Sequence, residues 1–410
     1  MTPTTPTPHA SPHASPHTSP LASPAGSISP FSNHPLEFTG SGSEYFRVWI
    51  VNLLLILVTL GIYLPWAKVR KIKYFYSNTL IDGHALDFHG EPRKMLRGTA
   101  LAGVFFVLYA QAFRVSPMAG LVASVAIIAL WPILFRASLR FRLANTSWRG
   151  LRFSFSGGLK ESILTVGVPL ALVLIPFSVL GFTDATAGAA SVGAQSLSAP
   201  AVIATGVLLV YALLIPYFYL RTARYRHDHY HYGSLRTELR CAPGPVYGVF
   251  LKLLLGTLVL AALVGVAFGL VTGISLASLK LAGRGNLGVI LASAVLVPVV
   301  LIFFNAIVKS YWVVRMQNLI WTRTGNRNVR FVSQLALAPF VWQQFKNYAL
   351  ILLSLGLYWP FAVVATRRMQ LEAVTLRSST SLDAITARAQ AESGALGDAA
   401  ADIFDMDMGL

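Results

Sequence analysis

Eight long apolar stretches constrain the fold of this chain more than any other feature. A bilayer core is about 30 Å thick and takes about 20 apolar residues as a helix. Stretches approaching that length lie at residues 46–66, 97–113, 118–135, 161–181, 200–220, 246–272, 287–312 and 346–366. A mean hydropathy of +0.60 and a charged share of only 12% exclude an ordinary soluble globular protein. The sequence therefore predicts an all-α polytopic membrane protein.

The middle six stretches are expected to form three helical hairpins, with turns near Pro117, at 182–199 and at 273–286. Of the 33 Lys and Arg residues, 24 lie in four segments, 67–97, 136–160, 221–252 and 309–330. Because Lys and Arg near span ends stay in the cytoplasm, these segments are predicted to be cytoplasmic and the turns to face outward. The net charge of +17 is then mainly a topology signal. Anionic lipid headgroups are expected partners, and nucleic acid is not.

Both ends of the chain differ from the apolar part. Residues 1–35 contain a low-complexity repeat of Ser, Pro, His and Ala, which has no apolar face to bury and predicts a disordered tail. Residues 379–410 combine several Asp and Glu residues with Ala and Gly and predict an acidic mobile tail. The membrane domain is therefore expected over residues 36–378.

A short sequence unit repeats at the predicted cytoplasmic ends of the spans. YFYSNTLIDGHALDFHG at 74–90 and FRLANTSWRGLRFSFSG at 141–157 share Asn-Thr, Gly and Phe-x-Gly at identical spacing, and a weaker copy lies at 315–321. Asn and Gly both tolerate a positive φ, so the unit is expected to turn there. The turn residues are Asn78, Gly83, Asn145, Gly150 and Asn318. The period-two aromatic alternation around each turn is compatible with short cytoplasmic strands beside an internally repeated helical fold.

The outermost apolar stretches carry nearly the same phrase, LGIYLPWA at 60–67 and LGLYWPFA at 355–362. Because the two segments are alike, they are expected to cross the membrane in the same direction. If both stretches are simple spans, however, the basic residues around them require opposite directions. The length of the apolar runs favours simple spans. One of the two spans would then violate the rule that Lys and Arg near span ends stay in the cytoplasm. The alternative is that each stretch breaks at its Gly and Pro and turns back. The structural or gating candidates are Asn52, Gly61, Tyr63, Pro65, Trp66, Asn347, Gly356, Tyr358 and Pro360.

One further pattern occupies residues 38–83. It consists of Phe38, Gly40, Tyr45, Phe46, Asn52, Thr59, Leu60, Gly61, Tyr63, Pro65, Trp66, Tyr74, Asn78, Thr79 and Gly83. With these residues the segment resembles the opening of the YjgN family of bacterial inner-membrane proteins, and with LGLYWPFA the resemblance extends over about residues 36–378. It implies a multi-pass protein of the bacterial inner membrane. It implies no reaction, since that family has no established biochemical function.

Few residues suggest chemistry. His227, His229 and His231 alternate in HDHYHYG and would share one face of a strand, which makes them weak candidates for a divalent metal site. The alternative is that the three histidines lie in an exposed variable loop and bind no metal. The predicted spans show no evident carboxylate of the kind that proton- or sodium-driven transporters use. Because nucleophile, phosphate-loop and zinc signatures are also missing, we expect neither an enzyme nor a cofactor.

Two functions remain open from the sequence. The first is a passive conduit for a small neutral or anionic solute, suggested by the repeated Pro-broken segments and the missing carboxylates. The second is a membrane scaffold that binds anionic lipid or a cytoplasmic partner through its basic loops. The candidate residues of this second function are Arg140, Arg142, Arg224, Arg226 and Arg315.

Overall fold

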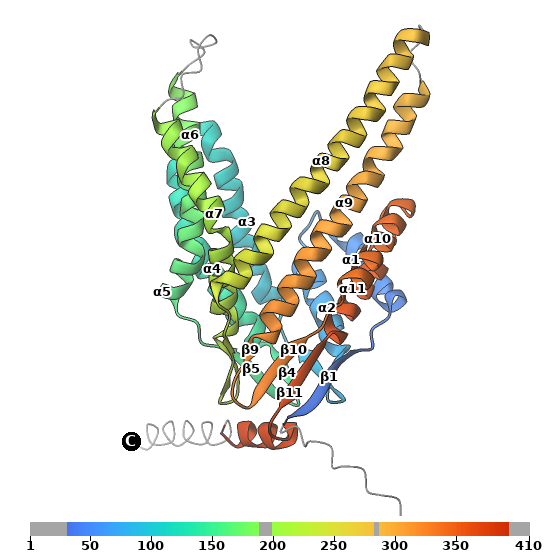
Figure 1. Cartoon of the computed structure of the whole chain (residues 1–410). Helices are drawn as coiled ribbons and strands as arrows, with labels where there is room; N and C mark the ends of the chain where they lie inside the picture. The colour runs from blue at the N-terminus through green and yellow to red at the C-terminus, as the bar shows by residue number, and fades with distance from the viewer. Residues whose placement is uncertain (1–30, 188–198, 283–286, 393–410) are drawn as a thin grey trace, which may run out of the picture.

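The structure, a computed structural model, describes residues 31–187, 199–282 and 287–392. An 11-stranded antiparallel sheet lies at one end of a set of helical hairpins (Figure 1). The chain builds this arrangement from five successive units, each with a strand, a helical hairpin and a second strand. Every hairpin therefore begins and ends at the sheet.

The first two units come from the N-terminal part of the chain. Unit 1 comprises β1 (Ser32–Phe38), α1 (Gly42–Val58), α2 (Leu64–Ser77) and β2 (Thr79–Ile81). Unit 2 comprises β3 (His84–Phe88), α3 (Pro92–Val115), α4 (Pro117–Ala144) and β4 (Thr146–Trp148).

The other three units follow in the same order. Unit 3 comprises β5 (Leu151–Phe155), α5 (Leu159–Ser162), the π-helical turn η1 (Ile163–Gly167), α6 (Val168–Ala187), α7 (Ala199–His227) and β6 (Tyr230–Tyr232), and is followed by β7 (Leu235–Arg236). Unit 4 comprises β8 (Glu238–Leu239), α8 (Pro243–Ala282), α9 (Leu287–Thr322) and β9 (Thr324–Gly325). Unit 5 comprises β10 (Val329–Ser333), α10 (Leu337–Leu353), α11 (Trp359–Glu372) and β11 (Val374–Ser378).

The sheet is a nearly closed barrel. Its strand order is β7-β6-β5-β4-β3-β2-β1-β11-β10-β9-β8. The pairing of β1 with β11 places Ser32 opposite Ser378 and so joins the two ends of the membrane domain. The edge strands β7 and β8 are separated in the chain only by Thr237. Because the edges are both short and contiguous, little unpaired backbone is left exposed.

This sheet shows that the prediction of an all-α fold is wrong. The individual strands have only two to seven residues, so each leaves a weak pattern beside apolar runs of about 20 residues. Several pairings, such as β1 with β11 and β3 with β4, also join segments far apart in the sequence, where local patterns carry no information about them.

The prediction of eight membrane-length apolar segments is also wrong. Within the described residues, five helices are long and apolar enough to cross a membrane. They are Pro92–Val115, Pro117–Ala144, Leu159–Gly181, Ala199–His227 and Pro243–Val266. By contrast, α1 and α10 have 17 residues each and are about 25 Å long at 1.5 Å per residue, which is shorter than the bilayer core.

Units 1 and 5 decide between the two alternatives for residues 46–66 and 346–366. Both segments are helical hairpins that turn back toward the sheet, so the simple-span alternative is wrong for both. The reversal occurs at Leu60 (φ 49°) and Gly61 (φ 92°) in unit 1, and at Leu355 (φ 52°) and Gly356 (φ 93°) in unit 5. Two successive residues in the left-handed region cannot continue a right-handed helix.

Tight two-residue turns link the first three units. Asp82 and Gly83 (φ 52° and 70°) connect β2 to β3, and Arg149 and Gly150 (φ 48° and 81°) connect β4 to β5. Positive φ at both central residues matches the right-handed twist of paired strands. The predicted turn glycines thus lie at the strand turns.

The predicted turn asparagines have other positions. Asn78 and Asn145 are the C-caps of α2 and α4, with φ of −99° and −101°. Their side-chain amides donate to the carbonyl oxygens of Tyr74 (2.8 Å) and Phe141 (2.7 Å). Asn318 lies within α9. None of the three has a positive φ, because each asparagine closes or braces a helix instead of forming the turn.

The barrel interior is an apolar core. Trp148, Tyr232, Val329 and Leu376 are buried there together with Leu382. Leu382 belongs to a helical segment, residues 382–392, that lies on the side of the sheet away from the hairpins (Figure 1). The predicted tail of 379–410 therefore begins with a packed helix. Residues 393–410, and residues 1–30 of the predicted N-terminal tail, lie outside the described residues.

Candidate functional site

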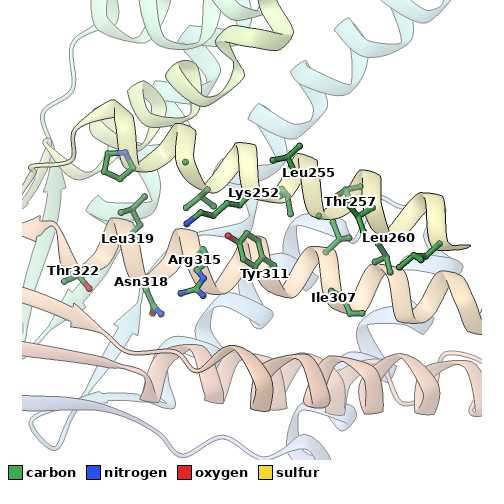
Figure 2. Close-up of a pocket in the computed structure, with 18 of the residues that line it drawn as sticks. Lys252, Leu255, Thr257, Leu260, Ile307, Tyr311, Arg315, Asn318, Leu319 and Thr322 are labelled. Carbon is green, nitrogen blue, oxygen red and sulfur yellow. The ribbon is translucent and has the colours of Figure 1, made fainter.

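A groove of about 1250 Å³ lies between α8 and α9. Figure 2 shows Lys252 from α8 and Tyr311 from α9 between the two helices, with Arg315 beside them. Farther from the sheet the walls are apolar, with Leu260, Leu263 and Ile307 among the lining residues. The groove therefore joins an apolar section to a basic end near the sheet.

Small residues of α8 leave the space for this groove. A Cβ atom placed on Gly248 or Gly256 would meet no other atom within 4 Å. These glycines therefore do not bring the two helices into close contact, although glycine often has that role in membrane helices. They widen the groove between α8 and α9.

The basic end has three cationic side chains, those of Lys252, Arg315 and Arg323. The Arg315 guanidinium lies 5.6 Å from the centre of the Tyr311 ring, in cation–π range. Arg323 Nη1 lies 3.7 Å from the Sγ atom of Cys241. In the described part of the chain no carboxylate pairs with any of the three cations.

Nearby carboxylates are engaged elsewhere. The backbone N–H of Leu239 donates to Asp228 Oδ1 at 2.6 Å, and Glu238 pairs with Arg240 at 3.1 Å. The positive charge at the end of the groove is therefore not neutralised by these neighbours, so an anionic group would be attracted to it.

Asn318 fixes the wall of the groove next to the sheet. Its Nδ2 donates to the carbonyl oxygen of Leu335 at 2.9 Å, and its Oδ1 accepts from the backbone N–H of Leu335 at 2.9 Å and from Ser333 Oγ at 2.9 Å. These bonds attach α9 to the end of β10. Although Asn318 lines the groove, its side chain is committed to the fold.

The arginines predicted to bind lipid have different surroundings. Only Arg315 lines the groove. Arg224 Nη2 donates to the carbonyl oxygen of Cys241 at 2.6 Å, and Arg226 Nε donates to that of Thr222 at 3.4 Å. Arg140 and Arg142 lie near the end of α4, in unit 2.

The gating candidates build the tips and the packing of the short hairpins. Pro65 and Pro360 are buried in the first turns of α2 and α11, where the missing N–H of proline costs least. Tyr63 stacks on Trp66 at 5.9 Å between ring centres, as Tyr358 does on Phe361 at 5.4 Å. Gly61 and Gly356 form the reversals described above, and Asn52 and Asn347 are buried between the helices of each pair.

The three histidines have three different partners. His227 Nδ1 is hydrogen-bonded to Thr324 Oγ1 (3.2 Å) and His231 Nε2 to Ser156 Oγ (2.7 Å). His229 Nε2 lies 3.1 Å from a carboxylate oxygen of Glu161. Over the described residues no group of three or more His, Cys, Asp or Glu side chains is placed to hold a metal ion.

Sequence reasoning missed Lys252, Tyr311 and Arg323 as parts of the site. Lys252 had a usable signal, since it is the single charged residue early in the apolar run of 246–272. A lone lysine in such a run extends its ammonium group toward the interface. Tyr311 and Arg323 had no comparable signal, because the pairing of α8 with α9 is what brings them together.

Comparisons with known proteins agree on one family. A family model described as "Bacterial protein of unknown function (DUF898)" matches residues 33–403. The chain is 34% identical over 131 residues to proteins named "Inner membrane protein YjgN" from Escherichia coli O157:H7 and from Escherichia coli strain K12. It is 27% identical over 162 residues to the protein of that name from Salmonella typhimurium.

The matched segments are partial. They cover 31%, 31% and 38% of this chain, and 32%, 32% and 41% of the three relatives in the same order. No solved structure matches the chain.

Proposed function

Because this chain belongs to the DUF898 family and is a multi-pass inner-membrane protein, we propose that it binds an anionic phospholipid in the groove between α8 and α9. The family is one of unknown function, and its matched relatives are named only as inner membrane proteins. The protein would act as a lipid-binding scaffold, without a chemical step.

The observation that carries the proposal is the combination of an apolar groove with unneutralised cations at one end. Acyl chains match the apolar section, where Leu260, Leu263 and Ile307 contribute to the walls. A phosphate matches Lys252 and Arg315, because charge-assisted hydrogen bonds from ammonium and guanidinium groups are the usual means of holding phosphate.

The depth of the cations supports a headgroup position. Lys252 follows the first residue of α8, Pro243, by nine positions, which is about 14 Å along the helix. The apolar part of α8 continues to Val266 within its membrane-length segment. A lipid placed with its phosphate at Lys252 would therefore extend its chains toward the bilayer centre. The positive-inside rule assigns this end to the cytoplasmic leaflet.

The conduit hypothesis has less support. Its candidate residues Gly61, Pro65, Gly356 and Pro360 form the reversals and first turns of the short hairpins. Leu60 and Leu355, at the two reversals, are each 94% exposed. Such tips are surfaces of the protein rather than walls of a passage.

Lipid retention tests the proposal. The full-length protein would be purified from its native membrane in mild detergent and its bound lipids identified by native mass spectrometry. Lys252→Gln with Arg315→Gln is expected to reduce retained phosphatidylglycerol and cardiolipin by about 30-fold, because each cation near the surface contributes about 1 kcal/mol.

Lys309→Gln is the matched control. Lys309 lies on the same helix, α9, but contacts the Tyr348 ring at 6.0 Å and does not line the groove. The Lys309→Gln variant should retain wild-type amounts of lipid. Equal lipid loss in Lys309→Gln, or unchanged lipid in the double variant, would contradict a site in this groove.

A further inference from the structure

A second cavity lies in unit 1 and differs from the corresponding region of unit 5. Aligning LGIYLPWA with LGLYWPFA pairs Asn52 with Asn347 and Lys71 with Thr366. Both asparagines are buried, with 6% and 1% of their surface exposed. The two hairpins therefore place the same amide in equivalent positions.

In unit 5 this amide is fully bonded within the protein. Gln343 Nε2 donates to Asn347 Oδ1 at 2.9 Å. Asn347 Nδ2 donates to Thr366 Oγ1 at 3.1 Å, and Gln344 Nε2 donates to the same hydroxyl at 2.9 Å. This network of side chains joins α10 to α11.

In unit 1 the sequence removes that network. The position of Gln343 is occupied by Val48, which has no side-chain donor, and that of Thr366 by Lys71. The Oδ1 atom of Asn52 is buried and has no hydrogen-bond partner among the described residues. A buried amide oxygen without a donor is costly, so the few instances in a structure call for an explanation.

Asn52 lines a cavity of about 320 Å³ between α1 and α2, to which Thr99 of α3 and Trp359 of α11 also contribute. Lys68 and Lys71 line the same cavity, one helical turn apart on α2. Within the described residues neither lysine forms an ion pair with a carboxylate. The cavity therefore combines two cations with a buried acceptor.

We propose that this cavity binds a phosphate group that carries a neighbouring hydroxyl or amine donor. The phosphate would accept from Lys68 and Lys71, and the donor would satisfy Asn52 Oδ1. Ethanolamine phosphate and glycerol phosphate have this chemistry, both as phospholipid headgroups and as soluble compounds. Choline phosphate carries the phosphate but no donor, so the site should reject it.

Thermal unfolding of the full-length protein in detergent tests the site. Dihexanoyl phosphatidylethanolamine at about 100 times its Kd should raise the Tm by about 3 °C, and dihexanoyl phosphatidylcholine should not. Free phosphoethanolamine is the soluble arm. A shift with phosphoethanolamine indicates a soluble ligand, and a shift with the lipid alone indicates a headgroup; either supports the site.

Two variants make the test specific. Val48→Gln with Lys71→Thr restores the donor and hydroxyl of unit 5, and should fold while losing the ligand-induced shift. Asn52→Leu should remove the preference for ethanolamine over choline.

Asn347→Leu is the matched control, which should lower the basal Tm through its broken network and keep the shift. Lys252→Gln with Arg315→Gln should also keep it, which separates this site from the α8/α9 groove.

The opposite results would overturn the proposal. Equal Tm shifts with ethanolamine and choline lipids would show that Asn52 Oδ1 does not accept a hydrogen bond from the ligand. An unchanged shift in Val48→Gln/Lys71→Thr would show that the ligand binds elsewhere, and no shift with any of the three compounds would show that the cavity binds no such phosphate.

Discussion

Arg149, at the tip of the β4–β5 turn, forms an ion pair with Asp383 at the start of the helical segment 382–392. The same guanidinium pairs with Asp82 of the β2–β3 turn at 2.7 Å and lies 4.8 Å from the centre of the Trp148 ring. One arginine therefore connects two strand turns to the helix that covers the end of the barrel core.

Replacing Arg149 with Gln should loosen the helical segment 382–392. The Asp383 side chain is 83% exposed, so its ion pair with Arg149 contributes little to stability. The ion pair with Asp82 and the contact with the Trp148 ring add to this contribution. We expect the free energy of opening this helical segment to fall by about 1–2 kcal/mol, which corresponds to about 5- to 30-fold less protection of 382–392 in hydrogen exchange.

Arg388→Gln is the control for this experiment. Arg388 lies on the same helix, and within the described residues its one ion pair is with Glu392 of that helix, at 3.2 Å. Its protection pattern should match the wild type. Full protection of 382–392 in Arg149→Gln would show that the ion pairs of Arg149 do not hold the helix.

Gly83→Val should destabilise the barrel by about 1–2 kcal/mol. Gly83 has φ of 70°, a conformation that a β-branched residue adopts only with strain. No atom lies within 4 Å of a Cβ built there, so the loss would come from the backbone and not from a clash. Chemical denaturation in detergent measures it. Gly98→Ala, in the interior of α3 and equally open, should be neutral or slightly stabilising.

The turned-back hairpins predict a specific labelling pattern on a Cys241→Ser background. Ser43→Cys, at the start of α1, and Ser379→Cys, just after β11, both lie at the sheet end, which the positive-inside rule places in the cytoplasm. Neither should react with a membrane-impermeant maleimide in intact cells, and both should react after permeabilisation. Met118→Cys, at the tip of the α3–α4 hairpin, is the outward control. Labelling of only one of the first two in intact cells would show that its apolar stretch crosses the membrane.

Acidification should destabilise the barrel through His231. Burial lowers the pKa of His231 below its ordinary value of 6.5, and the nearby charges of Arg236 and His229 lower it further. The unfolded state therefore takes up this proton at a higher pH than the folded state, so stability falls as the pH drops through about 6.5. A Tm series from pH 7.5 to 5.5 should show a smaller decrease in His231→Asn than in the wild type. An identical slope in both would remove His231 as the cause.

Much of the architecture follows from patterns within single segments. The apolar runs locate the hairpins, and the repeated Asn-Thr, Gly and Phe-x-Gly positions locate the helix ends and strand turns around Asn78, Gly83, Asn145 and Gly150. These features are local, because a helix end or a two-residue turn depends on residues adjacent in the chain. The candidate site was less accessible: of its cations, only Arg315 was among the residues singled out from sequence.

By itself the sequence determined the membrane class, the side on which the basic residues gather, the family and the repeated helix-to-strand unit. Only the tertiary structure decided that the 11 short strands form one nearly closed barrel, with Ser32 opposite Ser378. It also decided that residues 46–66 and 346–366 turn back and that Lys252 and Arg315 line the same groove. The physical reason is that strands of two to seven residues gain stability only by pairing with partners, and those partners lie up to the length of the domain away.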